Sequence, residues 1–316
     1  MPRTLVFCHA NSFAAGTYGV LFEAWRHAGW RVLAPEKLGH DPAYPITNGW
    51  RHLRDELLHF IGREAGAGPV ALVGHSMGGY LSLLAASRKP ALVNAVVLLD
   101  APIVSGWRTP AFGLLKLSGL MGRGGPGKAS ARRRAHWPTL EAARQHFARK
   151  PAFARWDARV LADYLRHGFE LGASGADDTG GASDANGASH AGSGVTLAFN
   201  REAETRIYNT LPHDVPAVLK RHPLRCPVSY IGSKRSAESR QLGIDFVRRL
   251  AGPRWKWVEG SHLFPMERPE ETAAAVLALL APTAGRGSTT TTTPNATSAT
   301  SATGATSAIT TAPVAR

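Results

Sequence analysis

Short apolar runs bounded by turn residues recur at wide intervals along the chain. Most of them are rich in β-branched residues, which is typical of strands that are buried on both faces of a sheet. Five such runs occupy residues 4–10, 30–36, 70–74, 95–101 and 227–232. A sixth run, residues 254–260, is more polar and predicts a weaker strand.

Stretches with helical spacing separate most of these runs. Residues 16–29, 50–66 and 78–87 each predict a helix, and Asn48 is a candidate cap for the second of them. Strands that alternate with helices are typical of an α/β fold with a mostly parallel sheet covered on both faces. The pattern therefore predicts about six strands in one sheet.

The alternation stops after residue 101 and resumes near residue 223. Residues 102–222 contain no clear buried strand, whereas 138–150 and 152–168 have the spacing of helices. We therefore expect a core formed by residues 1–101 and 223–281, with 102–222 inserted as a helical cap.

Two segments have compositions that cannot bury much apolar surface. Residues 171–194 consist largely of Gly, Ala, Ser and Asp, and residues 282–316 of Thr, Ala and Ser. The first predicts a flexible loop within the cap, and the second a disordered tail.

Composition excludes several classes of protein. The sequence holds only two cysteines and lacks a leader-like start and any apolar run long enough to span a membrane, so we expect a cytoplasmic protein without a membrane partner. Its net charge is +14, and arginines are densest at 128–137. No stacking aromatics or nucleic-acid motif accompany them, so this patch predicts a solvated basic surface and no nucleic-acid partner.

A candidate nucleophile lies where the apolar run 70–74 meets the helix at 78–87. Gly74-His75-Ser76-Met77-Gly78 has the pattern G-x-S-x-G. In a tight strand-to-helix turn the small residues avoid clashes, and the serine hydroxyl stands exposed beside a helix N-terminus. The motif therefore predicts that Ser76 is a catalytic nucleophile rather than an ordinary turn serine.

A serine needs a base, and His262 is the candidate because it follows the last predicted strand. With these residues in place, the chain resembles the α/β-hydrolase superfamily. The features that match are H-A-N after the first strand, G-H-S-M-G-G, D-A-P after the fourth strand, and G-S-H-L-F-P near the end. The resemblance covers residues 4–100 and 224–281, and the cap matches by placement alone.

The resemblance implies an oxyanion hole, formed by two backbone N–H groups that stabilise developing negative charge. One would come from Met77, which follows the nucleophile, and the other from Asn11 in the loop after the first strand. His9 in the same loop is better explained as a structural residue that hydrogen-bonds to the backbone.

The acid that orients the histidine has three alternatives. Many members of the superfamily place it after the strand that matches 227–232, where this sequence has no aspartate and reaches Glu238 first. Asp100, after the preceding strand, resembles the placement in a variant group within the superfamily and is our preferred candidate. The third alternative is that no acid is present.

These residues imply serine-based acyl transfer to water, with neither cofactor nor metal. The expected substrate is a small ester, lactone or related acyl compound, although a carbon–carbon bond hydrolase or a perhydrolase would use the same triad. A non-catalytic scaffold that binds a ligand or partner is the alternative from another class. The sequence does not indicate the substrate or the oligomeric state.

Overall fold

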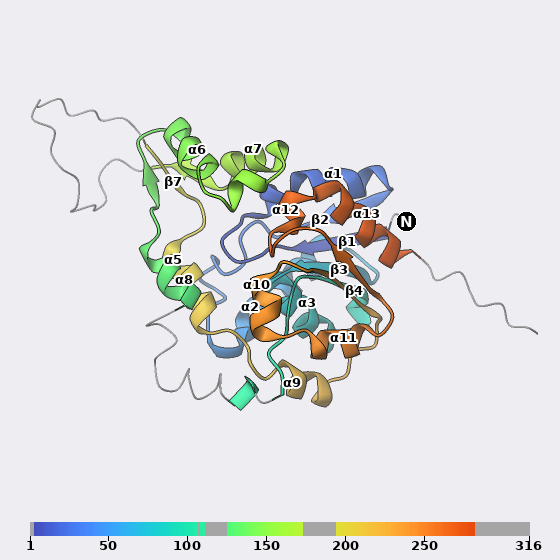
Figure 1. Ribbon diagram of the computed structural model, residues 1–316. Helices are drawn as coiled ribbons and strands as arrows, with labels where there is room; N and C mark the ends of the chain where they lie inside the picture. Colours follow the sequence, from blue (N-terminus) through green and yellow to red (C-terminus); the bar gives the residue numbers. More distant parts are fainter. Residues whose placement is uncertain (1–2, 107, 111–124, 173–193, 282–316) are drawn as a thin grey trace, which may run out of the picture. The chain divides into compact units, whose positions relative to one another are not determined.

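The computed structural model describes residues 3–106, 108–110, 125–172 and 194–281 (Figure 1). The chain divides into a compact unit, Met1–Ala281, and a second unit, Pro282–Arg316. The predicted disordered tail and residues 173–193 of the predicted loop lie outside the described residues. Among the described residues, no helix is both long and apolar enough to cross a membrane.

A six-stranded sheet forms the centre of the first unit, in the order β2-β1-β3-β4-β8-β9. Every neighbouring pair in it is parallel. The strands are β1 (Arg3–Cys8), β2 (Trp30–Leu33), β3 (Val70–His75), β4 (Val93–Leu99), β8 (Val228–Ser233) and β9 (Trp255–Val258). All six predicted strands are therefore present, and the predicted α/β fold is confirmed.

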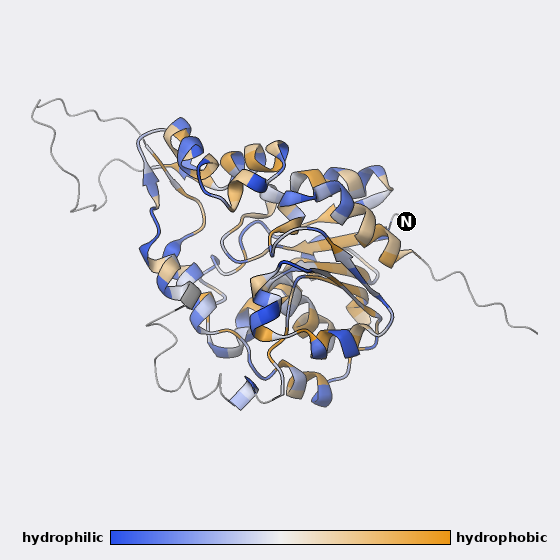
Figure 2. Cartoon of the chain, in the orientation of Figure 1, coloured by the Kyte–Doolittle hydropathy of each residue, from blue (hydrophilic) through white to orange (hydrophobic). Residues whose placement is uncertain are grey.

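Helices cover both faces of this sheet (Figures 1 and 2). One face carries α1 (Gly19–His27) and α13 (Pro269–Leu280), and the other carries α2 (Arg51–Glu64), α3 (Met77–Arg88), α9 (Val215–Arg221) and α11 (Asp245–Ala251). Alternate residues of each strand pack on opposite faces: Leu5 and Phe7 join the first apolar core, and Val6 and Cys8 join the second. Burial on both faces is the reason that the strands read as continuous apolar runs.

The segment between β4 and β8 contains helices and a second, smaller sheet. Its described helices are α5 (Gly125–Arg132), α6 (Leu140–Ala148), α7 (Ala158–His167) and α8 (Arg201–Asn209), followed by α9, which packs on the large sheet. Its antiparallel strands, in the order β5-β7-β6, are β5 (His136–Trp137), β7 (Val195–Leu197) and β6 (Phe169–Leu171). The sequence predicted helices in this segment and gave no sign of these strands, because strands of two or three residues are too short to show a period of two.

The predicted cap of the second helix is not found in the structure. Asn48 does not cap α2, because the residue before that helix is Trp50, which takes a left-handed conformation and makes no side-chain cap. The two short helices α10 (Ala237–Leu242) and α12 (Phe264–Glu267) follow β8 and β9, respectively. Glu238 lies on α10, and His262 lies in the loop between β9 and α12. Cys8 and Cys226 are both free thiols.

Candidate active site

Ser76 lies in a strained turn between β3 and α3. Its backbone has φ 51° and ψ −113°, a conformation that is rare for a residue with a side chain. The amide N–H of Ser76 donates to the carbonyl of Leu99 on β4, at 3.0 Å, and the Ser76 carbonyl accepts from the N–H of Gly79, at 2.9 Å. The surrounding backbone therefore holds the strain in place and leaves the half-buried side chain at the carboxyl edge of the sheet.

The glycines around Ser76 are required by close approaches of the backbone. A Cβ on Gly74 would overlap the carbonyl of Gly78, and a Cβ on Gly78 would overlap the carbonyl of Cys8 on β1. Gly79 faces the side chain of Ala101 in the same way. The motif thus allows α3 to begin directly against β1 and β4, which is the tight turn that the sequence pattern predicts.

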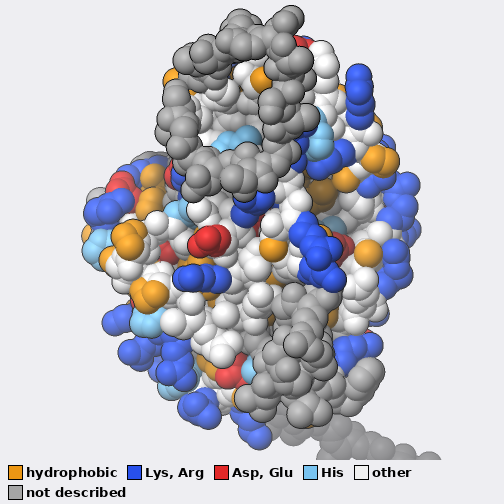
Figure 3. Space-filling view, turned by 90° about the vertical axis from the view of Figure 1, so that its left-hand side faces the viewer, with side chains coloured by type: hydrophobic (Ala, Val, Ile, Leu, Met, Phe, Trp, Pro, Cys, Tyr) orange, Lys and Arg blue, Asp and Glu red, His pale blue; other side chains and the backbone are white. Residues whose placement is uncertain are grey.

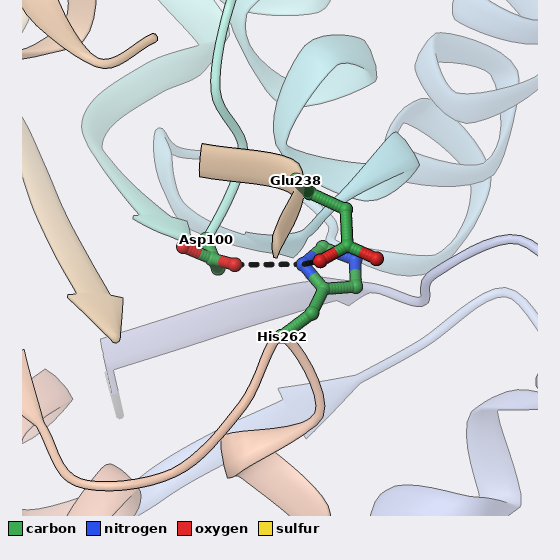
Figure 4. Close-up of side chains that lie close together, drawn as sticks. All are labelled: Asp100, Glu238 and His262. Carbon is green, nitrogen blue, oxygen red and sulfur yellow. Dashed lines mark hydrogen bonds and ion pairs between the residues drawn. The ribbon is translucent and has the colours of Figure 1, made fainter. Parts of the chain in front are cut away.

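Asp100 and His262 meet at the carboxyl ends of β4 and β9 (Figure 4). Nδ1 of His262 is 2.7 Å from Oδ2 of Asp100. The side chain of Asp100 is fully buried, and its other oxygen accepts hydrogen bonds from Ser239, at 2.7 Å, and Tyr230, at 3.2 Å. Three donors thus satisfy the carboxylate, as a buried charge requires.

The pKa values of this pair move apart in the directions that favour an ion pair. Burial raises the pKa of Asp100, but the hydrogen bond and charge of His262 and the nearby serine hydroxyls outweigh burial and hold it below its usual value. Burial also lowers the pKa of His262, but the hydrogen bond and charge of Asp100, with the charge of Glu238, raise it above its ordinary value. The environment therefore stabilises an imidazolium at His262.

Glu238 is the second carboxylate near His262. Its Oε2 is 3.8 Å from Nδ1 of His262, beyond hydrogen-bond distance, and its side chain is 46% exposed. Asp100, Glu238 and His262 also have ligand atoms close enough together to suggest a metal site. The same imidazole nitrogen is already engaged at hydrogen-bond distance by Asp100, so a proton between the two accounts for this geometry without an ion.

The candidate oxyanion residues lie on either side of the turn. Met77 begins α3, and Asn11 lies in the loop after β1, where both are buried. In the part of the chain that the structure describes, no protein acceptor pairs with either backbone N–H. The side chain of Asn11 points elsewhere, because its Nδ2 donates to the carbonyl of Glu204 on α8, at 3.1 Å.

His9 is a structural part of the loop that contains Asn11. Its Nδ1 bonds to the carbonyl of Ala10, at 2.8 Å, and its Nε2 accepts from the N–H of Leu38, at 2.8 Å. Burial lowers the pKa of His9 to about 4, so the ring is neutral at physiological pH. The ring thus ties the loop to the segment after β2.

A chain of buried hydrogen bonds joins this loop to the loop that carries His262. The N–H of Ala10 donates to the hydroxyl of Tyr18, at 3.2 Å, and that hydroxyl lies 2.8 Å from Nδ1 of His75. Nε2 of His75 lies 3.0 Å from the carbonyl of His262. Burial lowers the pKa of His75 to about 3, so the ring is neutral, with Nδ1 accepting and Nε2–H donating.

Sequence reasoning missed Tyr18, His75, Tyr230 and Ser239 as supporting residues. His75 fills a position that the motif leaves open, and Tyr18 and Tyr230 look like ordinary core residues of a helix and a strand. The one available signal was a hydroxyl or imidazole within an otherwise apolar run, because buried polar groups need partners. No hydrogen bond joins Ser76 Oγ to His262 among the described residues, so that contact stays a prediction.

The comparisons with known proteins agree with this architecture. The model of the alpha/beta hydrolase family matches residues 5–275, and the chain therefore belongs to that family. Among solved structures, E-2-(acetamidomethylene)succinate hydrolase superposes with a TM-score of 0.63 at 19% identity, covering 88% of this chain and 91% of that one. The thioesterase domain from the curacin biosynthetic pathway gives 0.61 at 15% identity, covering 87% and 91%. At these identities the likeness shows the fold alone.

The sequence relatives match a shorter part of the chain. The chain is 32% identical over 121 residues to the monoglyceride lipase homolog of Monkeypox virus and 28% identical over 111 residues to the monoglyceride lipase of Rattus norvegicus. These matches cover 36% and 33% of this chain, and only 44% and 37% of the two relatives. Distant homologues of the chain are therefore lipases and other hydrolases of the same family.

Proposed function

We propose that the protein is a serine hydrolase that cleaves an ester, lactone or related acyl bond of a small molecule. The observation that carries this proposal is the buried Asp100–His262 pair, which lies at the same edge of the sheet as the strained turn at Ser76. The names of the relatives, lipases among them, support acyl-bond hydrolysis as the reaction class.

In this mechanism His262 removes the proton of Ser76 as the hydroxyl attacks the carbonyl carbon of the substrate. Asp100 holds the imidazole in the tautomer whose Nε2 accepts that proton and stabilises the imidazolium that forms. The N–H groups of Met77 and Asn11 stabilise the oxyanion. His262 then protonates the leaving group, and water that it activates releases the acid and restores Ser76.

We further propose that residues 102–222 act as a cap over this edge of the sheet. Two contacts support that role: Phe13, in the loop after β1, packs against Trp156 and Tyr164, and Asn11 bonds to the backbone of Glu204. Tyr164 is fully buried in this aromatic packing, so it serves as core rather than as an open pocket wall. A substrate would bind between these residues and Ser76.

The first test is covalent labelling with a fluorophosphonate, followed by mass spectrometry of the adduct. The reagent needs no guess about the substrate, and we expect a single adduct on Ser76 that is lost in Ser76→Ala and in heat-unfolded protein. The same Ser76→Ala variant should show no turnover of short p-nitrophenyl esters above the background rate. Labelling of another residue, or of none in folded protein, would contradict the proposal and favour a non-catalytic scaffold.

A further inference from the structure

Four arginines from two helices and the chain beside them surround a hollow on the surface of the segment between β4 and β8. The hollow has a volume of about 360 Å³. Arg132, Arg133 and Arg134 come from the end of α5 and the residues after it, and Arg201 begins α8. Residues 135–138 complete the lining. Figure 3 looks onto this side of the molecule, where Lys and Arg side chains are prominent. We call this feature the arginine hollow.

Two of the four guanidinium groups, those of Arg134 and Arg201, are held in place by hydrogen bonds to backbone carbonyls. Nε of Arg134 donates to the carbonyl of His136, at 2.7 Å, and its guanidinium lies over the ring of Trp137, 5.5 Å from the centroid. Nη1 of Arg201 donates to the carbonyl of Arg133, at 3.1 Å. A guanidinium has five N–H donors, so each group keeps donors for a ligand while its orientation is already fixed.

The charges around the hollow are poorly balanced. Its described lining contains four arginines and no acidic residue. Within the described part of the chain, the carboxylate that pairs with one of these arginines is Glu204, whose Oε2 lies 2.9 Å from Nη2 of Arg133. The surplus positive charge extends to Lys150, whose pKa is lowered by burial and by the charge of Arg133. A negative ligand would be attracted here, and a neutral one would gain little.

The contact between Arg133 and Glu204 is close but incomplete. Nη2 of Arg133 and Oε2 of Glu204 have the separation of an ion pair but not the geometry of a hydrogen bond, and the buried Nε of Arg133 makes no hydrogen bond among the described residues. Nε of Arg133 is therefore available to pair with a ligand that binds in the hollow. Glu204 also accepts from the hydroxyl of Ser12, at 2.5 Å, next to the candidate oxyanion residue Asn11.

We propose that the arginine hollow binds an oxyanion, either a phosphate or a carboxylate group. The guanidinium groups of Arg134 and Arg201 would donate hydrogen bonds to it, and Arg133 would lie beside them. Planar guanidinium groups match the two oxygens of such a group, and paired charge-assisted hydrogen bonds are strong. Because Arg133 contacts Glu204, and Glu204 contacts Ser12 and Asn11, an occupied hollow can alter the loop that faces the reacting carbonyl. The ligand is either a separate anion or the charged end of the substrate.

Binding is tested by calorimetry with inorganic phosphate and with succinate, at constant ionic strength set with chloride. We expect saturable binding that weakens about tenfold or more in the double variant Arg134→Ala/Arg201→Ala. The conservative variant Arg134→Lys/Arg201→Lys should also weaken binding, because lysine keeps the charge but lacks the paired donors of a planar guanidinium group. Arg221→Ala/Arg249→Ala removes the same charge from exposed positions and should leave binding unchanged.

These measurements do not need turnover, so they can fail or succeed independently of the proposed hydrolase activity. An equal loss of affinity in the control variant, or the absence of saturable binding in every variant, would overturn the proposal. It would also be overturned if the protein bound only a DNA oligonucleotide and salt abolished that binding.

Kinetic measurements distinguish the two sources of the anion. If phosphate changes the rate on a neutral ester, the ligand is separate; if it only competes with an ester bearing a carboxylate, the hollow binds the substrate.

Discussion

The carboxyl edge of the large sheet and the segment between β4 and β8 differ in how they treat buried polar atoms. At the sheet edge, Asp100 accepts from three donors, and both ring nitrogens of His75 are bonded. Among the described residues, twelve buried side-chain atoms have no hydrogen-bond partner, and nine of these belong to residues 102–222. Polar satisfaction is therefore complete around Asp100 and His75, although Oδ1 of Asn11 lacks a partner among the residues that the structure describes, and it is incomplete in the segment that we propose as a cap.

The difference indicates that the two regions have different roles. A charge pair that moves a proton needs a fixed geometry, because a small displacement of a catalytic group is costly. A surface that receives ligand or water can leave donors and acceptors unpaired in the protein alone. On this view the sheet edge is pre-organised for chemistry, whereas buried atoms such as Nε of Arg133 and Nε1 of Trp156 have no hydrogen-bond partner within the described part of the protein.

The largest expected effect comes from Asp100→Asn. An asparagine keeps the shape and tolerates the positive φ of 40° at this position, but it presents an NH₂ to Nδ1 of His262 and favours the wrong tautomer. We expect kcat for ester hydrolysis to fall about 10⁴-fold, by the behaviour of other triads. Steady-state kinetics would measure the loss.

The control for Asp100→Asn is a check that the variant is still folded. Thermal unfolding and near-ultraviolet circular dichroism should show that the protein remains folded, since Ser239 and Tyr230 can still donate to the remaining oxygen. Retention of more than a hundredth of the wild-type kcat would show that the sheet edge is less strictly pre-organised than the hydrogen bonds indicate.

The next effect is on stability, through Tyr18→Phe. Removing this hydroxyl leaves the N–H of Ala10 and Nδ1 of His75 buried without partners. Each unsatisfied group costs about 1–3 kcal/mol, so the free energy of unfolding should fall by at least about 1 kcal/mol in a denaturant titration. Tyr44→Phe is the control, because the ring of Tyr44 packs on His59 and no hydrogen bond of its hydroxyl is present among the described residues. Equal losses in the two variants would mean that the hydrogen bonds of the Tyr18 hydroxyl contribute nothing to the free energy of unfolding.

The sequence predicted more of the sheet edge than of the segment between β4 and β8. Buried strands appear in the sequence as continuous apolar runs, and the turn at Ser76 needs small residues at particular positions. Both features can therefore be recognised in a single sequence. The strand Val195–Leu197 has three residues and no period to detect. The choice between Asp100 and Glu238 depended on which side chain reaches Nδ1 of His262, and only packing determines that distance.

A matched pair of threonines tests the comparison directly. Thr272 on α13 is fully buried, and its hydroxyl donates to the carbonyl of Arg268, at 2.7 Å, whereas Oγ1 of Thr205 on α8 is buried without a partner. Thr272→Val should cost about 1 kcal/mol more than Thr205→Val, since only the first breaks a hydrogen bond. Denaturant titrations of both variants give the difference. A larger cost at Thr205 would show that its hydroxyl has a partner in solution.

The smallest effect is expected for Glu238→Gln, and it concerns pH. His262 must be neutral to accept the proton of Ser76, so kcat/KM should rise as pH passes upward through its pKa. Asp100 and, to a lesser degree, Glu238 raise that pKa, and therefore the rise should occur above the ordinary value of 6.5. Loss of the Glu238 charge should move the rise to lower pH without lowering the plateau.

The shift should be slight, because Glu238 is half exposed and its interaction with His262 is screened by water and salt. Raising the salt concentration should also shift the wild-type pH profile of kcat/KM to lower pH, and it should leave the Glu238→Gln profile nearly unchanged. A plateau that collapses in Glu238→Gln and survives in Asp100→Asn would reverse the assignment of the acid. In that case the exposed carboxylate would orient His262, and the complete hydrogen bonding of Asp100 would serve only the stability of the sheet edge.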